Sequence, residues 1–175
     1  ADKVALREAE GRGPIQDFLA ETAKRHGVWL VGGSLPLVAT DPGKVLNSCL
    51  VYDPYGQRKA RYDKIHLFGF QKGSECYNES ATIEAGSKPL AFEAPFGRIG
   101  LSICYDLRFP ELYRALGACD LHIIPAAFTE TTGRAHWEVL LRARAIENQC
   151  YVLAVGQGGK HENGRETHGN SMLID

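Results

Sequence analysis

The sequence has almost no excess of charge of either sign and no long apolar run. Its 20 lysines and arginines nearly balance its 21 aspartates and glutamates, which gives a net charge of −1 over 175 residues. Nucleic acids and anionic membranes are usually bound through a basic excess, so we expect neither as a partner. The apolar stretch 121–128 contains His122 and Pro125, and it is far shorter than the ~18 residues of a membrane span. The composition predicts a soluble protein that binds small molecules or other proteins.

The sequence is also poor in cysteine. Its five cysteines are an odd and small number, whereas disulfide scaffolds are short and rich in cysteine. No spacing of Cys and His matches a zinc site, and we expect neither a metal nor a cofactor. The polar segment before residue 15 lacks the apolar core of a signal peptide. These absences favour the reducing cytoplasm as the location.

The two ends of the sequence are unusual for a domain. The chain starts at Ala1 without an initiator Met, and it stops within Leu173-Ile174-Asp175, which resembles the middle of an apolar strand. The length fits one domain with its own core. We therefore expect residues 1–175 to be a single domain, cut at both ends from a longer polypeptide.

Short apolar runs alternate with amphipathic segments along the chain, which is typical of an α/β sandwich. The turn Asp53-Pro54-Tyr55-Gly56 predicts a hairpin between the apolar runs on either side of it. Residues 68–86 are rich in Gly, Ser and Asn and are predicted to form a long surface loop, a kind that is usually functional. The expected helices are 14–26, 109–116 and 133–148, and the expected strands are 28–31, 46–52, 59–64, 90–92, 98–104, 121–124, 151–155 and 171–174.

Periodicity predicts which helix faces are buried. In the first helix the expected buried face is Ile15, Phe18, Leu19, Thr22 and Ala23. In the longest helix it is Val139, Leu140, Ala143 and Ile146, beside an ionic stripe of Arg134, Glu138 and Arg142.

Cys104 lies between a predicted strand and a predicted helix. Ligands gather at this point in α/β sheets, and a helix N-terminus lowers the pKa of a nearby thiol towards the reactive thiolate. This position makes Cys104 a candidate nucleophile. The alternative is a small buried hydrophobe, which is what we expect of Cys49 and Cys150, whereas Cys76 and Cys119 are expected in loops.

A thiol nucleophile needs a charge partner and a proton shuttle. Among the six histidines, His66 and His136 are the best placed, although no cysteine-protease signature surrounds them. Lys64 is a rival candidate, because strand alternation puts it on the same face as the apolar Ala60 and Tyr62. The alternative for Lys64 is a charge at the rim of the sheet with its stem on apolar surface.

Three blocks carry a resemblance to a known family. They are YDKIHL at residues 62–67, GLSICYDLRFPEL at 100–112, and HWE at 136–138 followed by RARAIEN at 142–148. In this order they resemble the nitrilase superfamily of carbon–nitrogen hydrolases, and within it the nitrilase-like amidases. The likeness covers essentially the whole chain.

The resemblance implies a four-layer αββα sandwich with mixed sheets and outer helices, which pairs into a larger sandwich on dimerisation and is incomplete here at both ends. It also implies a Glu-Lys-Cys site that hydrolyses amide C–N bonds through a thioester. Cys104 would be the nucleophile and Lys64 the catalytic lysine. Glu79 matches a second glutamate beside that lysine; its alternative is an ordinary solvated loop acid. Lys64 and the backbone N–H of Tyr105 would stabilise the oxyanion.

The first glutamate of such a site, the general base, has no match in the sequence. The resemblance places it in a Pro-Glu pair at the end of an early strand, before the helix that starts near Pro14. Glu8 and Glu10 lie in a polar stretch with no strand before them. We therefore expect the general base upstream of residue 1.

Three residues are candidates to contact the substrate. Arg108 is a candidate to bind a substrate carboxylate through its planar fork, or to brace the turn by pairing with Asp106 or Glu111. Phe128 and Thr129 are candidates to line the pocket. The resemblance implies a small ω-amide of the deaminated-glutathione or 2-oxo-acid kind, and a homodimer formed through the helices near 109–116 and 133–148.

The sequence is also compatible with alternative hypotheses of function. Within the family, the substrate of the enzyme could instead be an N-carbamoyl amino acid or a nitrile. A Cys-His hydrolase would need His66 or His136 instead of Lys64. An inactive family member would serve as a binding or assembly module.

Overall fold

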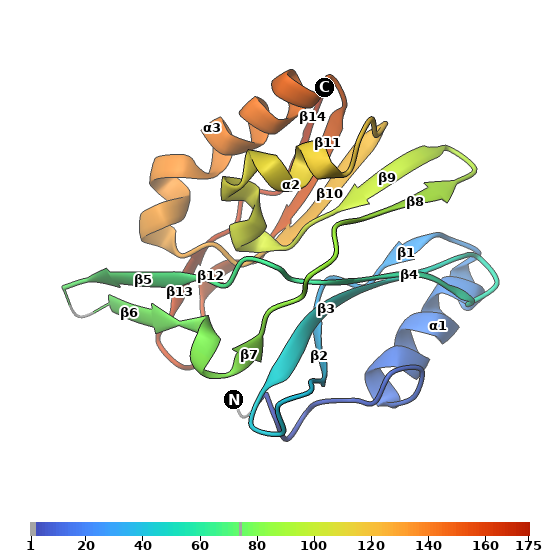
Figure 1. Ribbon diagram of the computed structural model, residues 1–175, viewed down its shortest axis with the longest axis horizontal. Helices are drawn as coiled ribbons and strands as arrows, with labels where there is room; N and C mark the ends of the chain where they lie inside the picture. The colour runs from blue at the N-terminus through green and yellow to red at the C-terminus, as the bar shows by residue number, and fades with distance from the viewer. Residues whose placement is uncertain (1–2, 74) are drawn as a thin grey trace. The chain divides into compact units, whose positions relative to one another are not determined.

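The computed structural model describes residues 3–73 and 75–175, which form two compact units, 1–88 and 89–175. Each unit combines a mixed five-stranded sheet with α-helix (Figure 1). This arrangement confirms the α/β class that the alternating pattern predicts. No helix among the described residues is long and apolar enough to cross a membrane.

In the first unit, the long strand β3 (Val45–Tyr52) is the centre of the sheet. It pairs antiparallel with β1 (Leu30–Val31), β2 (Leu35–Val38) and β4 (Arg58–Asp63), and parallel with β7 (Ile83–Glu84). The predicted hairpin is therefore confirmed. The Asp53 carboxylate stabilises its turn, because Oδ1 accepts hydrogen bonds from the backbone N–H groups of Tyr55 and Gln57, both at 2.9 Å.

Helix α1 (Pro14–His26) begins at a proline and ends where Gly27 takes a left-handed φ of 62°. Leu19 and Ala23 pack against Leu35, Leu37, Leu50 and Tyr52 in the core of this unit. The predicted face is wrong at Phe18, whose side chain is 65% exposed. The polar Gln16 takes a buried position instead, because its amide group bonds to Glu8 and to backbone carbonyls.

The segment 68–86 is more ordered than the predicted loop. It contains the hairpin of β5 (Gly69–Lys72) and β6 (Glu75–Asn78), then the short 3₁₀ helix η1 (Glu79–Ala81), and then β7. Cys76 is therefore in a strand. Phe68, just before the hairpin, packs its ring with those of the cross-strand partners Phe70 and Tyr77, at centroid distances of 5.7–6.5 Å.

In the second unit the sheet has the order β14-β11-β10-β9-β8. The strands β9 (Gly97–Leu101), β10 (Leu121–Ala126) and β11 (Tyr151–Gly156) are parallel. The edge strands β8 (Leu90–Ala94) and β14 (Met172–Ile174) run antiparallel to their neighbours. Helices α2 (Pro110–Ala115) and α3 (Glu130–Asn148) lie together beside this sheet (Figure 1). Between β11 and β14 lies a hairpin of β12 (Gly158–Lys160) and β13 (Glu166–His168).

Strands β9 and β10 do not end where the sequence predicts. Strand β10 continues through Pro125, because its pairing with β9 ends at Ile123 and the missing N–H of proline costs no ladder bond there. Strand β9 ends at Leu101, and Cys104 starts the 3₁₀ helix η2 (Cys104–Arg108).

The predicted buried face of α3 is also wrong. Val139 and Ile146 are 62% and 74% exposed, whereas Trp137, Leu141, Arg144 and Ala145 are buried. Arg144 tolerates burial because its Nε donates to the Leu107 carbonyl at 3.0 Å and its guanidinium pairs with Glu147 and lies over the Tyr113 ring. The helix begins three residues earlier than predicted, where the Thr129 side chain accepts a hydrogen bond from Thr132 N.

Candidate active site

Lys64 follows strand β4, and its side chain has no exposed surface. Ala60 and Tyr62, on the same face, are also buried, which confirms the prediction from strand alternation. Lys64 is therefore not a charge at the rim of the sheet. Its ammonium forms an ion pair with the Glu79 carboxylate, and a buried lysine needs such a partner to stay charged.

The backbone around Lys64 is held on both sides. Its N–H donates to the Asn47 carbonyl at 2.9 Å, and its carbonyl accepts from Gly86 N at 2.8 Å. A Cβ at Gly86 would lie 2.2 Å from the Asp63 carbonyl oxygen. Only glycine allows this close approach. Gly86 therefore helps to hold the backbone of Lys64 in place.

Glu79 is the first residue of η1. Its Oε2 accepts from Lys64 Nζ and also from Phe68 N at 2.8 Å, and its own N–H donates to the Phe68 carbonyl at 2.9 Å. Glu79 is therefore not a solvated loop acid. Its carboxylate ties the β5–β6 hairpin to the buried lysine.

Cys104 has a left-handed backbone with φ of 51°. A residue other than Gly, Asn or Asp rarely adopts this conformation, which costs roughly 1–3 kcal/mol and is concentrated at functional sites. The turn is closed by Asp106, whose Oδ2 accepts from Ile103 N at 2.9 Å. Cys104 is partly exposed, at the point where strand β9 gives way to η2.

The other cysteines differ from Cys104. Cys49 and Cys150 are buried as predicted, and burial raises the pKa of their thiols to about 12 and about 11. Thiols with such pKa values are inert at neutral pH. Cys76 is exposed on β6, and Cys119 is partly exposed between α2 and β10.

The guanidinium of Arg108 lies near two aromatic rings. Its central carbon is 5.4 Å from the ring centroid of Phe128 and 5.7 Å from that of Tyr105. Its Nη1 is 3.3 Å from His136 Nδ1. These are contacts of a side chain held by stacking, and the pairing with Asp106 or Glu111 that the sequence suggested is not among the ion pairs of the described residues.

Phe128 and Thr129 precede α3 and are both buried. The Phe128 ring packs on Trp137 at a centroid distance of 4.9 Å. The hydroxyl of Thr129 is 2.9 Å from that of Thr132 and caps the helix. Phe128 therefore faces Arg108, whereas the Thr129 side chain is used by the fold.

Glu8 has a role that the sequence did not indicate. It bridges Leu37 of β2 in parallel, and its buried carboxylate accepts from Ile15 N at 2.6 Å, Gln16 N at 3.1 Å and Gln16 Nε2 at 3.0 Å. This carboxylate satisfies the free N–H groups at the start of α1. Glu10 is exposed and pairs with Arg58 and Arg61.

The structure thus brings together two sets of predicted residues. Lys64 and Glu79 meet in the first unit. Arg108 meets Tyr105 and Phe128 in the second unit, and Tyr105 directly follows Cys104 in the chain.

Comparison with known proteins adds the family. A sequence model of the family "Carbon-nitrogen hydrolase" matches residues 2–175. The deaminated glutathione amidase of Yersinia enterocolitica is 47% identical over 173 residues, which are 96% of this chain and 60% of that protein. The chain therefore belongs to the carbon–nitrogen hydrolase family, and it spans about 60% of the length of this curated relative.

Solved structures of similar fold belong to the same group of proteins. Saccharomyces cerevisiae Nit3, a member of the nitrilase superfamily, superposes with a TM-score of 0.85 at 29% identity, over 99% of this chain and 63% of that one. The amidase from Nesterenkonia sp., with acrylamide added at its active-site cysteine, gives a TM-score of 0.77 at 28% identity, over 91% of this chain and 59% of that one. These neighbours confirm the nitrilase-type fold that the three blocks implied.

Proposed function

We propose that the protein is a thiol-dependent amidase that hydrolyses the C–N bond of a small ω-amide, with Cys104 as the nucleophile. The observation that carries the proposal is the left-handed backbone of Cys104 at the end of strand β9. Family membership and the similarity to a deaminated glutathione amidase support this choice.

The proposed chemistry is acyl transfer in two steps. The Cys104 thiolate attacks the amide carbonyl, the C–N bond breaks and ammonia leaves, and water then hydrolyses the thioester to a carboxylate. Both steps pass through an oxyanion, for which we propose Lys64 and the N–H of Tyr105 as donors. Loss of one such donor typically lowers the rate by about 10²–10³. Glu79 would hold the ammonium of Lys64 in place.

The proton transfers also need a general base. Glu8 and Glu10 are poor candidates, because the carboxylate of Glu8 is used by α1 and that of Glu10 by two arginines. We propose that this base is a glutamate outside residues 1–175.

On the substrate side, we propose that Arg108 binds a carboxylate of the ω-amide and that Phe128 lines the same pocket. Among the described residues, the guanidinium fork has one side-chain hydrogen bond, to His136, so an incoming carboxylate would find donors. Thr129 would contribute by fixing the turn that carries Phe128.

Three further proposals concern the protein as a whole. We propose that residues 1–175 are part of a single hydrolase domain, that the protein is a homodimer formed through α2 and α3, and that it is cytoplasmic. The exposed Val139 and Ile146 on α3 support the dimer, and the odd number of cysteines supports the compartment.

The test uses the complete protein and its Cys104→Ala variant. We expect the wild type to release ammonia from ω-amides such as succinamate and to form a thioester adduct visible by intact mass, and the variant to do neither. Ammonia release that survives in Cys104→Ala would contradict the site. Loss of activity in His66→Ala or His136→Ala with full activity in Lys64→Ala would favour a Cys-His hydrolase. No turnover of amides, nitriles or N-carbamoyl amino acids, together with no alkylation of Cys104, would favour a binding module.

A further inference from the structure

The end of strand β13 is attached to the turn that carries Phe128. The backbone N–H of His168, the last residue of β13, donates to the Phe128 carbonyl at 3.0 Å. The preceding residue, Thr167, forms an isolated antiparallel bridge with Thr129. The backbone on both sides of the Phe128–Thr129 peptide is thus paired with β13.

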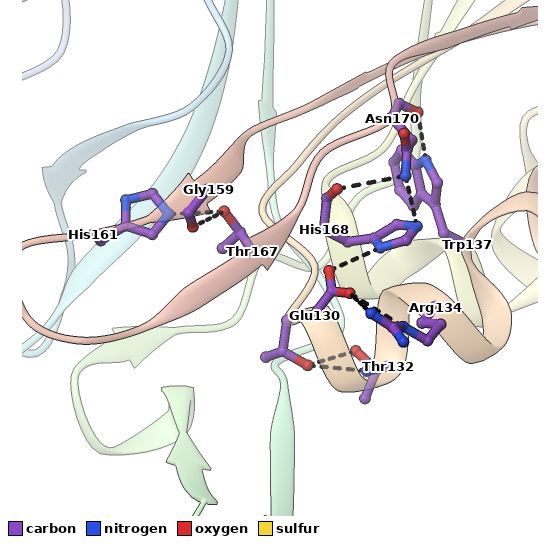
Figure 2. A network of polar contacts seen from close by, with 10 residues as sticks. Glu130, Thr132, Arg134, Trp137, Gly159, His161, Thr167, His168 and Asn170 are labelled. Atoms are coloured by element: carbon purple, nitrogen blue, oxygen red, sulfur yellow. Dashed lines mark hydrogen bonds and ion pairs between the residues drawn. The ribbon is translucent and has the colours of Figure 1, made fainter.

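The His168 side chain adds a second attachment, shown in Figure 2. Its Nδ1 lies 3.1 Å from Glu130 Oε2, and its Nε2 lies 2.9 Å from Asn170 Nδ2. Because a carboxylate only accepts and an amide nitrogen only donates, the proton of the ring is on Nδ1 and Nε2 is the acceptor. Glu130 also accepts from Arg134 at 2.7 Å. Hydrogen bonds from Arg134 and then His168 lower the pKa of Glu130, which keeps this acceptor ionised.

Close packing makes a third attachment. A Cβ at Gly133, in the first turns of α3, would lie 2.3 Å from the His168 Cβ, so the helix and the histidine are in tight contact. Asn170, which has a left-handed φ of 56°, accepts a 2.7 Å hydrogen bond on its carbonyl from Trp137 Nε1 (Figure 2). Trp137 in turn packs on the Phe128 ring. The backbone, the imidazole and the tryptophan all restrain Phe128.

Phe128 is one of the two rings that hold the Arg108 guanidinium. We propose that His168 is a positioning residue for substrate binding: by fastening the Phe128 turn to α3, it fixes the ring on which Arg108 rests and so sets the affinity for a substrate carboxylate. This inference rests on the proposed function, in which Arg108 is the carboxylate anchor.

The test compares two amides that differ in one group. Succinamate has a carboxylate where butanamide has a methyl group. In the complete protein we expect His168→Ala to raise KM for succinamate about tenfold, the effect of weakening one charge-assisted contact. The kcat for succinamate and the KM for butanamide should stay within about twofold. His168→Gln keeps a donor for Glu130 and should restore most of the affinity. If the alanine variant does not fold, the test is made with His168→Gln instead.

Two controls isolate the mechanism. His161→Ala removes a histidine of the same hairpin whose side chain hydrogen-bonds only to Thr167 among the described residues, at 2.8 Å, and it should leave both KM values unchanged. In an Arg108→Ala background, His168→Ala should have no further effect on KM for succinamate, because it acts through the arginine.

The outcomes separate this inference from the proposed function. Equal losses for both amides, or a full effect of His168→Ala without Arg108, would show a general structural role and overturn the inference. Failure of the wild type to hydrolyse either amide would contradict the proposed function. Calorimetry of succinamate binding to the Cys104→Ala protein, with and without His168→Ala, then still decides the positioning role: a loss of affinity of about tenfold supports it, and equal affinity overturns it.

Discussion

The ion pair between Lys64 and Glu79 is unequally shielded, because the lysine side chain has no exposed surface whereas the glutamate side chain keeps 23% of its own. Removal of the carboxylate would leave a buried ammonium without a counter-charge. We expect Glu79→Ala to lower the free energy of unfolding by about 3–5 kcal/mol, measured by urea denaturation. Lys64→Met in the same protein should recover part of this loss, since the unpaired charge is gone.

The control for this pair is Glu138→Ala, which breaks an exposed i,i+4 pair with Arg142. Such pairs contribute roughly 0–1 kcal/mol. If Glu79→Ala costs no more than Glu138→Ala, the lysine is not dependent on Glu79 for its charge balance.

Glu8 and Glu10 provide a second matched comparison. The buried carboxylate of Glu8 accepts three hydrogen bonds at the start of α1, whereas that of Glu10 is exposed and pairs with arginines. We expect Glu8→Ala to cost about 2 kcal/mol and to speed amide exchange at Ile15 and Gln16, and Glu10→Ala to cost less than about 1 kcal/mol. Similar exchange rates at these amides in both variants would refute the cap.

His122 gives a prediction for pH. Burial, and then the nearby charge of Arg144, lower its pKa to about 4, and neither ring nitrogen has a hydrogen-bond partner within the described part of the chain. An unfolded histidine has a pKa near ~6.5. Below pH ~6.5 the unfolded chain binds a proton at His122 that the folded chain does not bind. The contribution of neutral His122 to the free energy of unfolding is therefore complete above pH ~6.5, and it falls by about 3 kcal/mol in all as the pH drops towards 4.

The variant His122→Leu removes the titrating group and should flatten the pH dependence of the urea midpoint between pH 6.5 and 4. It should also be more stable than the wild type at pH 5, since it removes two unsatisfied polar atoms. The exposed His26→Gln serves as the control and should keep the wild-type slope. An unchanged slope in His122→Leu would assign the acid sensitivity to other groups.

The proposed dimer can be tested on the exposed apolar residues of α3. Because Val139 and Ile146 are 62% and 74% exposed in the chain, their replacement by Asp should cost the protomer little stability and should halve the mass measured by sedimentation. Phe18→Asp, at an equally exposed site on α1, should leave the dimer intact. If the protein stays dimeric with both α3 residues changed, the dimer interface does not lie on this face of α3.

Local signals predicted much of this fold. The turn at Asp53–Gly56 defined the hairpin of β3 and β4, and period-2 alternation placed Lys64 on the buried face. The three family blocks indicated the fold that solved relatives share. These signals succeed because turn chemistry and strand alternation act over a few residues.

The errors arise where distant partners decide burial. Arg144 is buried and Ile146 is exposed on α3 because Leu107, Tyr113 and Glu147 satisfy the arginine, and a helical periodicity of apolar residues contains no such information. The sequence did not predict the role of Glu8, because Glu8 caps α1 from outside the usual N-cap position. Its signal, a carboxylate shortly before a Gly-Pro helix start, is too common to identify a cap without the structure.

The left-handed backbone of Cys104 has a consequence for redesign of this protein. Glycine adopts that conformation without strain, so any procedure that selects sequences for stability alone will favour Gly at position 104 and remove the proposed nucleophile. Position 104 should therefore be held fixed when thermostable variants are sought, and screens for them should measure turnover as well as melting temperature.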